Sequence, residues 1–141
     1  MTYQIIYSSE ATAAMSVSDL ERILADARSG NAARGITGAL VYVEGVFLQI
    51  LEGKEDTVRE LMRHIAADSR HGAVKVFHEA EVDEPLFGNW RMAFLSATPE
   101  QMAVWSGLEG TASIEAILEE VRRSPQRVSH VAANLLKALA A

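Results

Sequence analysis

The chain has 141 residues, which fits one domain, and 49% of them are hydrophobic, which is enough to bury a core. The formal net charge of −6 argues against a general nucleic-acid binder, because such proteins need a basic face, and the lack of cysteine excludes disulfides, thiolate catalysis and cysteine-based zinc sites. The sequence opens with no signal peptide and has no run as long as a membrane span. We therefore expect a cytoplasmic protein that binds neither nucleic acid nor membrane.

Apolar residues at strand and helix spacing predict seven elements in the first two thirds of the chain. In chain order they are a strand at 2–8, a helix between a cap at Ser16 or Ser18 and Gly35, strands at 36–43 and 46–51, a helix ending near 68–72, and strands at 74–80 and 90–95. Glu44-Gly45 between the second and third strands is typical of a hairpin turn. On the last strand, Trp90, Met92 and Phe94 are expected to share one face.

This order is βαββαβ with an extra fifth strand, which is the ferredoxin-like arrangement of an α+β fold. Right-handed crossovers place both helices on one face of such a sheet. Two apolar helical stripes follow, at 114–121 and 128–139, and Thr98-Pro99 and Ser124-Pro125 are good helix starts. We expect residues 1–96 to form the main domain and residues 97–141 to form a helical extension that caps the second sheet face. A partner surface is the alternative use of these stripes.

Three polar side chains fall where the predicted core should be apolar. Gln49 lies between Phe47 and Leu51 on one strand face, and Asn31 ends the apolar stripe of the first helix. Burying an amide without partners costs about 1–3 kcal/mol, so a polar group should meet each of them. Each amide could simply cap a backbone group, and the Tyr7 hydroxyl could lie at the rim of the sheet. Together the three indicate a ligand with a flat apolar body and a polar edge.

The segments around these residues resemble BLUF domains, which sense blue light using flavin. The matching segments lie in family order and at family spacing; they are Ile5–Ser9, Gly30–Gly38, Phe47–Gly53, Asp68–His71 and Asn89–Met92. The resemblance covers about Met1 to Leu95. It implies that residues 1–96 are a flavin-binding domain, that the protein is a photoreceptor and not an enzyme, and that the cofactor is FAD, with FMN or riboflavin possible.

The resemblance also implies roles for single residues. Tyr7 matches the redox tyrosine, Gln49 matches the glutamine that bridges it to the N5 and O4 edge of the flavin, and Asn31 matches an asparagine that binds O4 and N3. The other expected cofactor contacts are two helix residues that sandwich the ring, two residues of the last strand beside the glutamine, and three toward the ribityl or phosphate group: Ile23 and Ile65, Trp90 and Met92, and Asp68, Arg70 and His71. Gly30 is a departure, because many members have a second asparagine there.

An excited flavin is a strong oxidant, so Tyr7 can give it an electron, and the proton can follow through the Gln49 amide, which is donor and acceptor at once. A changed hydrogen bond to O4 would then shift the flavin absorption to the red. We expect this change to bias the last strand and the tail after Leu95. The expected receiver is a separate effector protein, or a homo-oligomer of this chain.

Two other classes of function stay open. A cofactor-free ferredoxin-like module that binds a partner protein would make Gln49 a structural residue. A small enzyme such as a phosphoryl hydrolase finds no support, because the sequence has no P-loop, no Gly-x-Ser-x-Gly elbow and no set of metal ligands. His64, His71 and His78 recur every seven residues, but they fall on a helix, a turn and a strand, so no metal site is expected.

Overall fold

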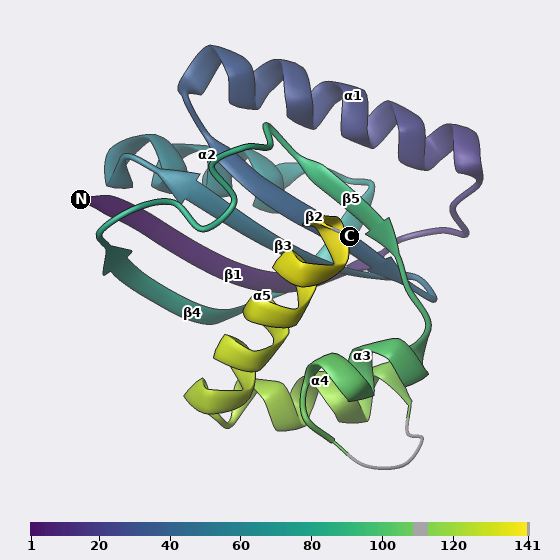
Figure 1. The fold of residues 1–141 in the computed structure, drawn as a ribbon. Helices are drawn as coiled ribbons and strands as arrows, with labels where there is room; N and C mark the ends of the chain where they lie inside the picture. Colours follow the sequence, from purple (N-terminus) through teal and green to yellow (C-terminus); the bar gives the residue numbers. More distant parts are fainter. Residues whose placement is uncertain (109–112, 141) are drawn as a thin grey trace.

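The computed structural model describes residues 1–108 and 113–140 (Figure 1). Its elements, in chain order, are β1 (Thr2–Ala11), α1 (Val17–Arg34), β2 (Thr37–Val43), β3 (Val46–Gly53), α2 (Glu55–Ala67), β4 (His71–Val82), β5 (Ala93–Ser96), α3 (Pro99–Trp105), α4 (Ile114–Arg122) and α5 (Pro125–Ala140).

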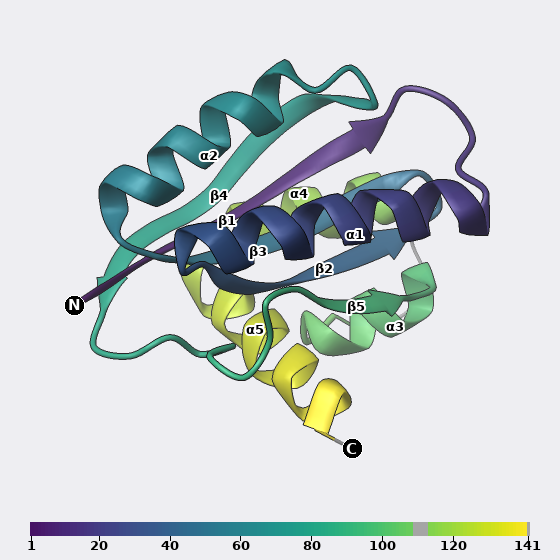
Figure 2. The ribbon, with the colours of Figure 1, turned by 90° about the horizontal axis from the view of Figure 1, so that it is seen from above.

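The five strands form one sheet in the order β4-β1-β3-β2-β5. Neighbouring strands are antiparallel except for the edge pair β2 and β5, which is parallel. Helices α1 and α2 lie side by side over one face, and α3, α4 and α5 cover the other face (Figures 1 and 2). The predicted ferredoxin-like fold with a fifth strand and a cap of C-terminal helices is therefore confirmed.

Helix α1 begins at the first of the two predicted caps. The Ser16 hydroxyl accepts from the Asp19 backbone N–H at 3.1 Å, and the Asp19 carboxylate accepts from the Ser16 N–H at 2.9 Å, which makes a reciprocal capping box. The helix ends at Gly35, whose φ of 68° lies in the left-handed region that favours glycine. Its N–H donates to the Asn31 carbonyl, so Asn31 lies within the last turn of the helix and faces the sheet.

Alternation along the central strands divides the interior into two cores. On β3, Phe47 and Leu51 face α1 and α2, and we call this side the helix-pair core. Leu48 and Ile50 face the C-terminal helices, and we call this side the tail core. The tail core also contains the predicted stripes of α4 and α5; its members there are Ile114, Ile117, Leu118, Val121, Val128, Val131, Ala132 and Leu135. The central strands are thus buried on both faces, which explains the near-continuous apolar run of β3.

The last two strands differ from their predicted bounds. β4 is longer than the expected 74–80, and β5 begins at Ala93 instead of Trp90. The chain bends at Arg91 and Met92, after the Gly38 N–H has donated to the Trp90 carbonyl at 3.1 Å and before regular pairing of β5 with β2 starts at Ala93. The prediction that Trp90 shares a face with Met92 and Phe94 was therefore wrong. Trp90 packs against the tail core, whereas Met92 and Phe94 belong to the helix-pair core.

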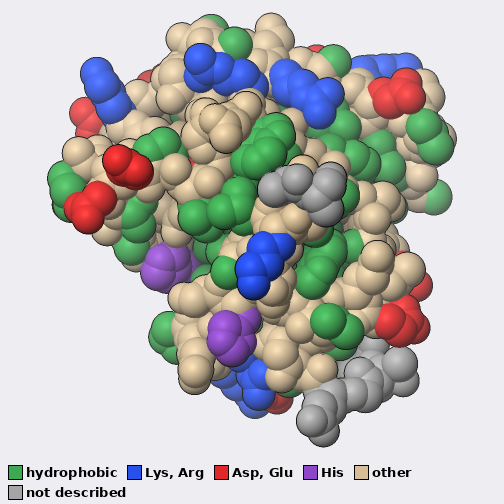
Figure 3. All heavy atoms as spheres, in the orientation of Figure 1, with side chains coloured by type: hydrophobic (Ala, Val, Ile, Leu, Met, Phe, Trp, Pro, Cys, Tyr) green, Lys and Arg blue, Asp and Glu red, His purple; other side chains and the backbone are tan. Residues whose placement is uncertain are grey.

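The outer surface reflects this layering. In the orientation of Figure 1, apolar side chains gather across the middle of the molecule, and most of the basic and acidic side chains lie toward the top and the sides (Figure 3). Within the described ranges, no helix combines the length and the apolar character needed to cross a membrane.

Candidate functional site

A cavity lies between α1 and α2 above the central strands β1 and β3, with about 630 Å³ of empty space including its open mouth. Its lining comes from both helices and from strands β1, β2, β3 and β4. The predicted site residues that it brings together are Tyr7, Ile23, Asn31, Gln49, Ile65, Asp68, Arg70 and His71. Residues from four separate segments of the sequence thus meet at one place.

The floor of the cavity holds a hydrogen-bonded pair. Tyr7 and Gln49 are direct partners in the pairing of β1 with β3, and both side chains are buried. The Tyr7 hydroxyl donates to Gln49 Oε1, and Gln49 Nε2 donates to the Met92 sulfur at 3.6 Å. The glutamine amide therefore accepts on one side and donates on the other, which is what a proton relay requires.

The tyrosine is neutral under ordinary conditions. Burial raises the pKa of Tyr7 far above its usual value, and the negative charge of Asp68 raises it further. The hydroxyl proton is therefore present at neutral pH and is directed at Gln49 Oε1.

Helix α1 fixes the approach to β5 through two side chains. Asn31, which is buried, donates from Nδ2 to the Arg91 carbonyl at 2.5 Å, and Arg28 donates from Nε to the Met92 carbonyl at 3.0 Å. An amide has a second N–H and an acceptor oxygen, so Asn31 can also meet a ligand in the cavity that it lines.

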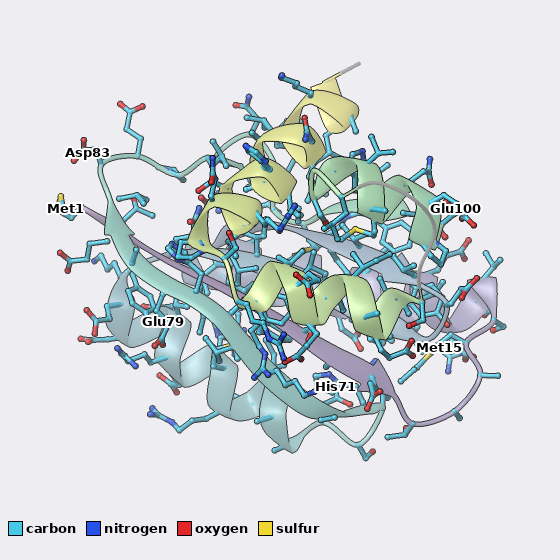
Figure 4. The ribbon with its side chains drawn as sticks, turned by 90° about the horizontal axis from the view of Figure 1, so that it is seen from below. Met1, Met15, His71, Glu79, Asp83 and Glu100 are labelled. Atoms are coloured by element: carbon cyan, nitrogen blue, oxygen red, sulfur yellow. The ribbon has the colours of Figure 1, made fainter. Side chains whose placement is uncertain are left out.

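The mouth of the cavity is charged. Arg70 contacts Asp68 at 2.6 Å and Asp26 at 3.0 Å, and the hydrogen bonds from the Arg70 guanidinium hold the pKa of Asp68 below its usual value. His71, at the start of β4 (Figure 4), has Nε2 2.5 Å from the Ile65 carbonyl and Nδ1 2.7 Å from the Ser9 hydroxyl. Because a carbonyl only accepts, His71 Nε2 is the protonated nitrogen.

Met92 and Trp90, both expected beside the glutamine, are placed differently. Met92 is buried in the helix-pair core with its sulfur at Gln49. Neither residue belongs to the cavity lining, and the Trp90 ring lies on the other side of the sheet, 6.3 Å from the centre of the Phe87 ring. The bend before β5 separates the two side chains, so only one of them occupies the position next to the glutamine.

Several lining residues were missed in the sequence. They are Ser9, Ala27, Leu40, Phe47 and Leu61. Residue spacing could have identified most of them. Ser9 and Phe47 alternate with Tyr7 and Gln49 along their strands. Ala27 and Leu61 lie four residues from Ile23 and Ile65 on their helices. Small or apolar residues at such positions fit a packed core equally well, so their spacing alone does not identify a cavity lining.

The lining fits the flavin ring that the sequence resemblance implies. Ile23 of α1 and Ile65 of α2 offer apolar walls from opposite sides, while the amides of Asn31 and Gln49 offer donors and acceptors for a polar ring edge. Arg70, at the mouth, suits the polar end of such a molecule. In the part of the chain that the structure describes, no three His, Asp or Glu side chains lie close enough to hold a metal ion.

Comparison with known proteins gives a consistent result. A family model described as BLUF, sensors of blue-light using FAD, matches residues 2–93. The chain is 38% identical over 110 residues to the β subunit of photoactivated adenylate cyclase from Euglena gracilis, and 37% identical over 109 residues to the α subunit. Each match covers 77% of this chain but only 13% and 11% of those proteins, so the chain spans a small part of their length.

Three solved structures share the fold. The dark-state structure of BlrB, a BLUF protein, has a TM-score of 0.78 at 24% identity, covering 97% of this chain and 96% of BlrB. The ground state of BlsA has a TM-score of 0.70 at 27% identity, covering 88% and 89%. Klebsiella pneumoniae BlrP1 with FMN and cyclic diGMP has a TM-score of 0.63 at 27% identity, covering 87% of this chain and 30% of BlrP1.

Proposed function

The chain belongs to the BLUF family of blue-light sensors, and from that premise we propose that it is a photoreceptor in which Tyr7 and Gln49 carry the photochemistry of a bound flavin. The observation that supports this most is the buried hydrogen bond from the Tyr7 hydroxyl to Gln49 Oε1 in the floor of the cavity. In a cofactor-free module, this polar pair would have no reason to face an open cavity.

The flavin, when bound, supplies a light-absorbing ring that is a strong oxidant in its excited state. Tyr7 is the electron donor, and its hydroxyl proton moves toward Gln49 Oε1, along the existing hydrogen bond. Gln49 then rotates or tautomerises and presents a different group to Met92 and to the cavity. The electron and the proton return to Tyr7, so the cycle consumes no substrate and residues 1–141 act as a sensor, not as an enzyme.

Asn31, Ile23 and Ile65 would hold the flavin ring, and Asp68, Arg70 and His71 would lie near the ribityl or phosphate group. FAD is our proposal for the bound form, because the matching family is described by that cofactor. FMN is the alternative, because the matched Klebsiella structure contains FMN. Chromatography of the flavin released from the purified protein distinguishes FAD from FMN and riboflavin.

The signal leaves the cavity through Met92, which contacts Gln49 and precedes β5 directly. We propose that residues 97–141 are an output extension of the domain, and that the receiver is a separate effector protein or a second copy of this chain. Support comes from the matched relatives, which are subunits of photoactivated adenylate cyclases. In those proteins, by their names, light acts on a cyclase.

The deciding experiment is an absorption spectrum of the purified protein, reconstituted with FAD, in the dark and directly after blue light. We expect a flavin spectrum that shifts reversibly to the red, since a stronger hydrogen bond to O4 lowers the transition energy. Bound flavin without a shift would contradict the proposed photochemistry. Protein that takes up no flavin would leave the partner-binding module as the better account of the fold.

A further inference from the structure

Glu52 is a buried carboxylate that the proposed photochemistry does not use. It lies on β3, three residues after Gln49, and its side chain points to the opposite face of the sheet, where 1% of it is exposed. No ion pair among the described residues involves Glu52. A buried charge without a counter-ion is costly and persists only where several hydrogen bonds compensate it.

Four hydrogen bonds reach Glu52, and the two shortest come from one loop. Its two oxygens accept from the successive backbone N–H groups of Leu86, at 2.6 Å, and Phe87, at 2.7 Å. A third bond comes from Gln4 Nε2, at 2.9 Å, across the β1–β3 pair, and a longer fourth one comes from the Thr37 hydroxyl, at 3.5 Å. Bonds from N–H groups to an ionised carboxylate are about twice as strong as those between neutral groups, so Glu52 fixes the loop between β4 and β5 to the central strand that also carries Gln49.

The anchored loop determines where Trp90 lies. Phe87, directly at the anchor, is fully buried in the tail core. The Trp90 N–H donates to the Phe87 carbonyl at 3.1 Å, and the two rings pack together. Trp90 is therefore held on the tail side of the sheet by a turn whose first residues are bound to Glu52.

Two residues after Trp90, the side chain lies on the opposite face of the sheet. Met92 lies in the helix-pair core beside Gln49, and α1 holds its carbonyl and that of Arg91 through Arg28 and Asn31. The crossing between Trp90 and Met92 is thus fixed at its start by Glu52 and at its end by α1. Without either attachment, the segment from Trp90 to Met92 could shift, and Trp90 could then replace Met92 beside Gln49.

We propose that Glu52 is a positioning residue of the photochemical site: it anchors the loop before β5 and thereby keeps Met92, and not Trp90, at Gln49. The inference rests on the proposed photoreceptor function for its optical consequence, but the anchoring itself is testable without flavin. Glu52 touches neither the cavity nor Gln49, so its effect on the site is transmitted through residues 86–92.

The test variant is Glu52→Gln, which keeps shape and replaces one acceptor oxygen with an NH₂ group. Since Leu86 and Phe87 bind different oxygens, one of the two N–H groups then faces a donor and loses its partner. The matched control is Gln4→Leu, which removes one hydrogen bond to the same carboxylate and leaves both bonds from the loop in place.

The flavin-free readouts are amide hydrogen exchange at Leu86 and Phe87, the NMR signal of the Met92 methyl group, and the emission of Trp90 in a Trp105→Phe background. We expect Glu52→Gln to speed exchange at the loop amides about tenfold or more, to shift the Met92 methyl signal and to move the Trp90 emission. The Gln4→Leu control should change none of them. An unmoved Met92 signal in Glu52→Gln would overturn the positioning role.

The optical readout is the rate at which the light state decays in the dark. A positioning role through Met92 predicts that Glu52→Gln changes this rate by about tenfold or more, as misplacement near a reacting group does, and has little further effect in a Met92→Ala background. Effects that multiply independently would contradict it. If Glu52→Gln does not fold, the same cycle uses Glu52→Asp, which keeps the charge but shortens the reach. A wild-type protein without any light response refutes the proposed function, while the flavin-free readouts still decide the anchoring.

Discussion

Tyr7 and Gln49 face each other directly across the β1–β3 pair, and the tyrosine hydroxyl donates to the glutamine oxygen inside the cavity. The pair is joined to the edge of the sheet by one further contact, from Gln49 Nε2 to the Met92 sulfur. A change in the glutamine amide can therefore reach the strand that leads to the C-terminal helices through the Met92 side chain.

Replacing Tyr7 with Phe removes the electron and proton donor but leaves the ring that fills the floor. We expect Tyr7→Phe to bind flavin as the wild type does, to lose the light-induced red shift completely, and to lose about 1–3 kcal/mol of stability from the unpaired Gln49 oxygen. Dark and light absorption spectra and urea unfolding measure these effects. Tyr3→Phe is the control: Tyr3 points to the same side but bonds Glu79, outside the cavity lining, so it should keep the shift.

Replacing Gln49 with Leu removes the relay between Tyr7 and Met92. We expect Gln49→Leu to retain flavin, because the apolar walls from α1 and α2 are unchanged, but to show no reversible red shift. The same spectra test this. A full shift in Gln49→Leu would mean that Tyr7 acts on the flavin without the amide, and the proposed relay would be wrong.

The tyrosines make stability depend on alkaline pH. Burial raises the pKa of Tyr3 to about 12 and that of Tyr7 beyond it, whereas in the unfolded chain both titrate near the ordinary value of about 10. Their contribution is complete below pH 10 and falls as the pH rises above it, since the unfolded chain then loses protons that the folded protein keeps. Urea unfolding between about pH 8 and 11 should show this decline, and it should be smaller in Tyr7→Phe.

Gly30, where many BLUF domains have asparagine, lies within α1 and costs the helix stability. A Cβ atom there would approach only the terminal nitrogen of the Arg34 side chain, at 2.7 Å, and that flexible group can move. We expect Gly30→Ala to raise the free energy of unfolding by about 0.5–1 kcal/mol. Gly35→Ala is the opposite control, because its φ of 68° should make the same change destabilising by about 1–2 kcal/mol.

The charged mouth of the cavity makes its own contribution at acid pH. Hydrogen bonds from Arg70 lower the pKa of Asp68, so the stability from this carboxylate is complete above its ordinary pKa and is lost as the pH falls through the lowered value. In Arg70→Gln, NMR titration should show the pKa of Asp68 moving back up. An unchanged pKa would assign the shift to the backbone N–H of Arg70, which also bonds Asp68.

The sequence supported much of the fold, because alternation and helical spacing report which face of an element is buried. The orientation of Ile23 and Ile65 toward the sheet follows from such spacing on α1 and α2. The pairing of Tyr7 with Gln49 does not, since strand register depends on contacts between distant segments. It was reached from a family resemblance and not from the pattern itself.

Trp90 and Glu52 show where pattern analysis fails. Trp90 was placed with Met92 because strict alternation was assumed, yet the chain bends at Arg91 and Met92 before β5 begins. Glu52 gave no signal at all, because a carboxylate at the end of a strand is normally solvated. Its partners are backbone N–H groups more than thirty residues away, and no side-chain pattern records those.

The four residues of β5 pair with β2 alone and connect the cavity to α3, α4 and α5. Such a connection works in both directions. An effector that binds the illuminated arrangement of the tail more tightly than the dark one must, by reciprocity, stabilise the illuminated arrangement by the same factor. A bound effector would therefore lower the free energy of the illuminated arrangement relative to the dark one, and would make the balance between the two depend on the effector concentration as well as on the chain itself.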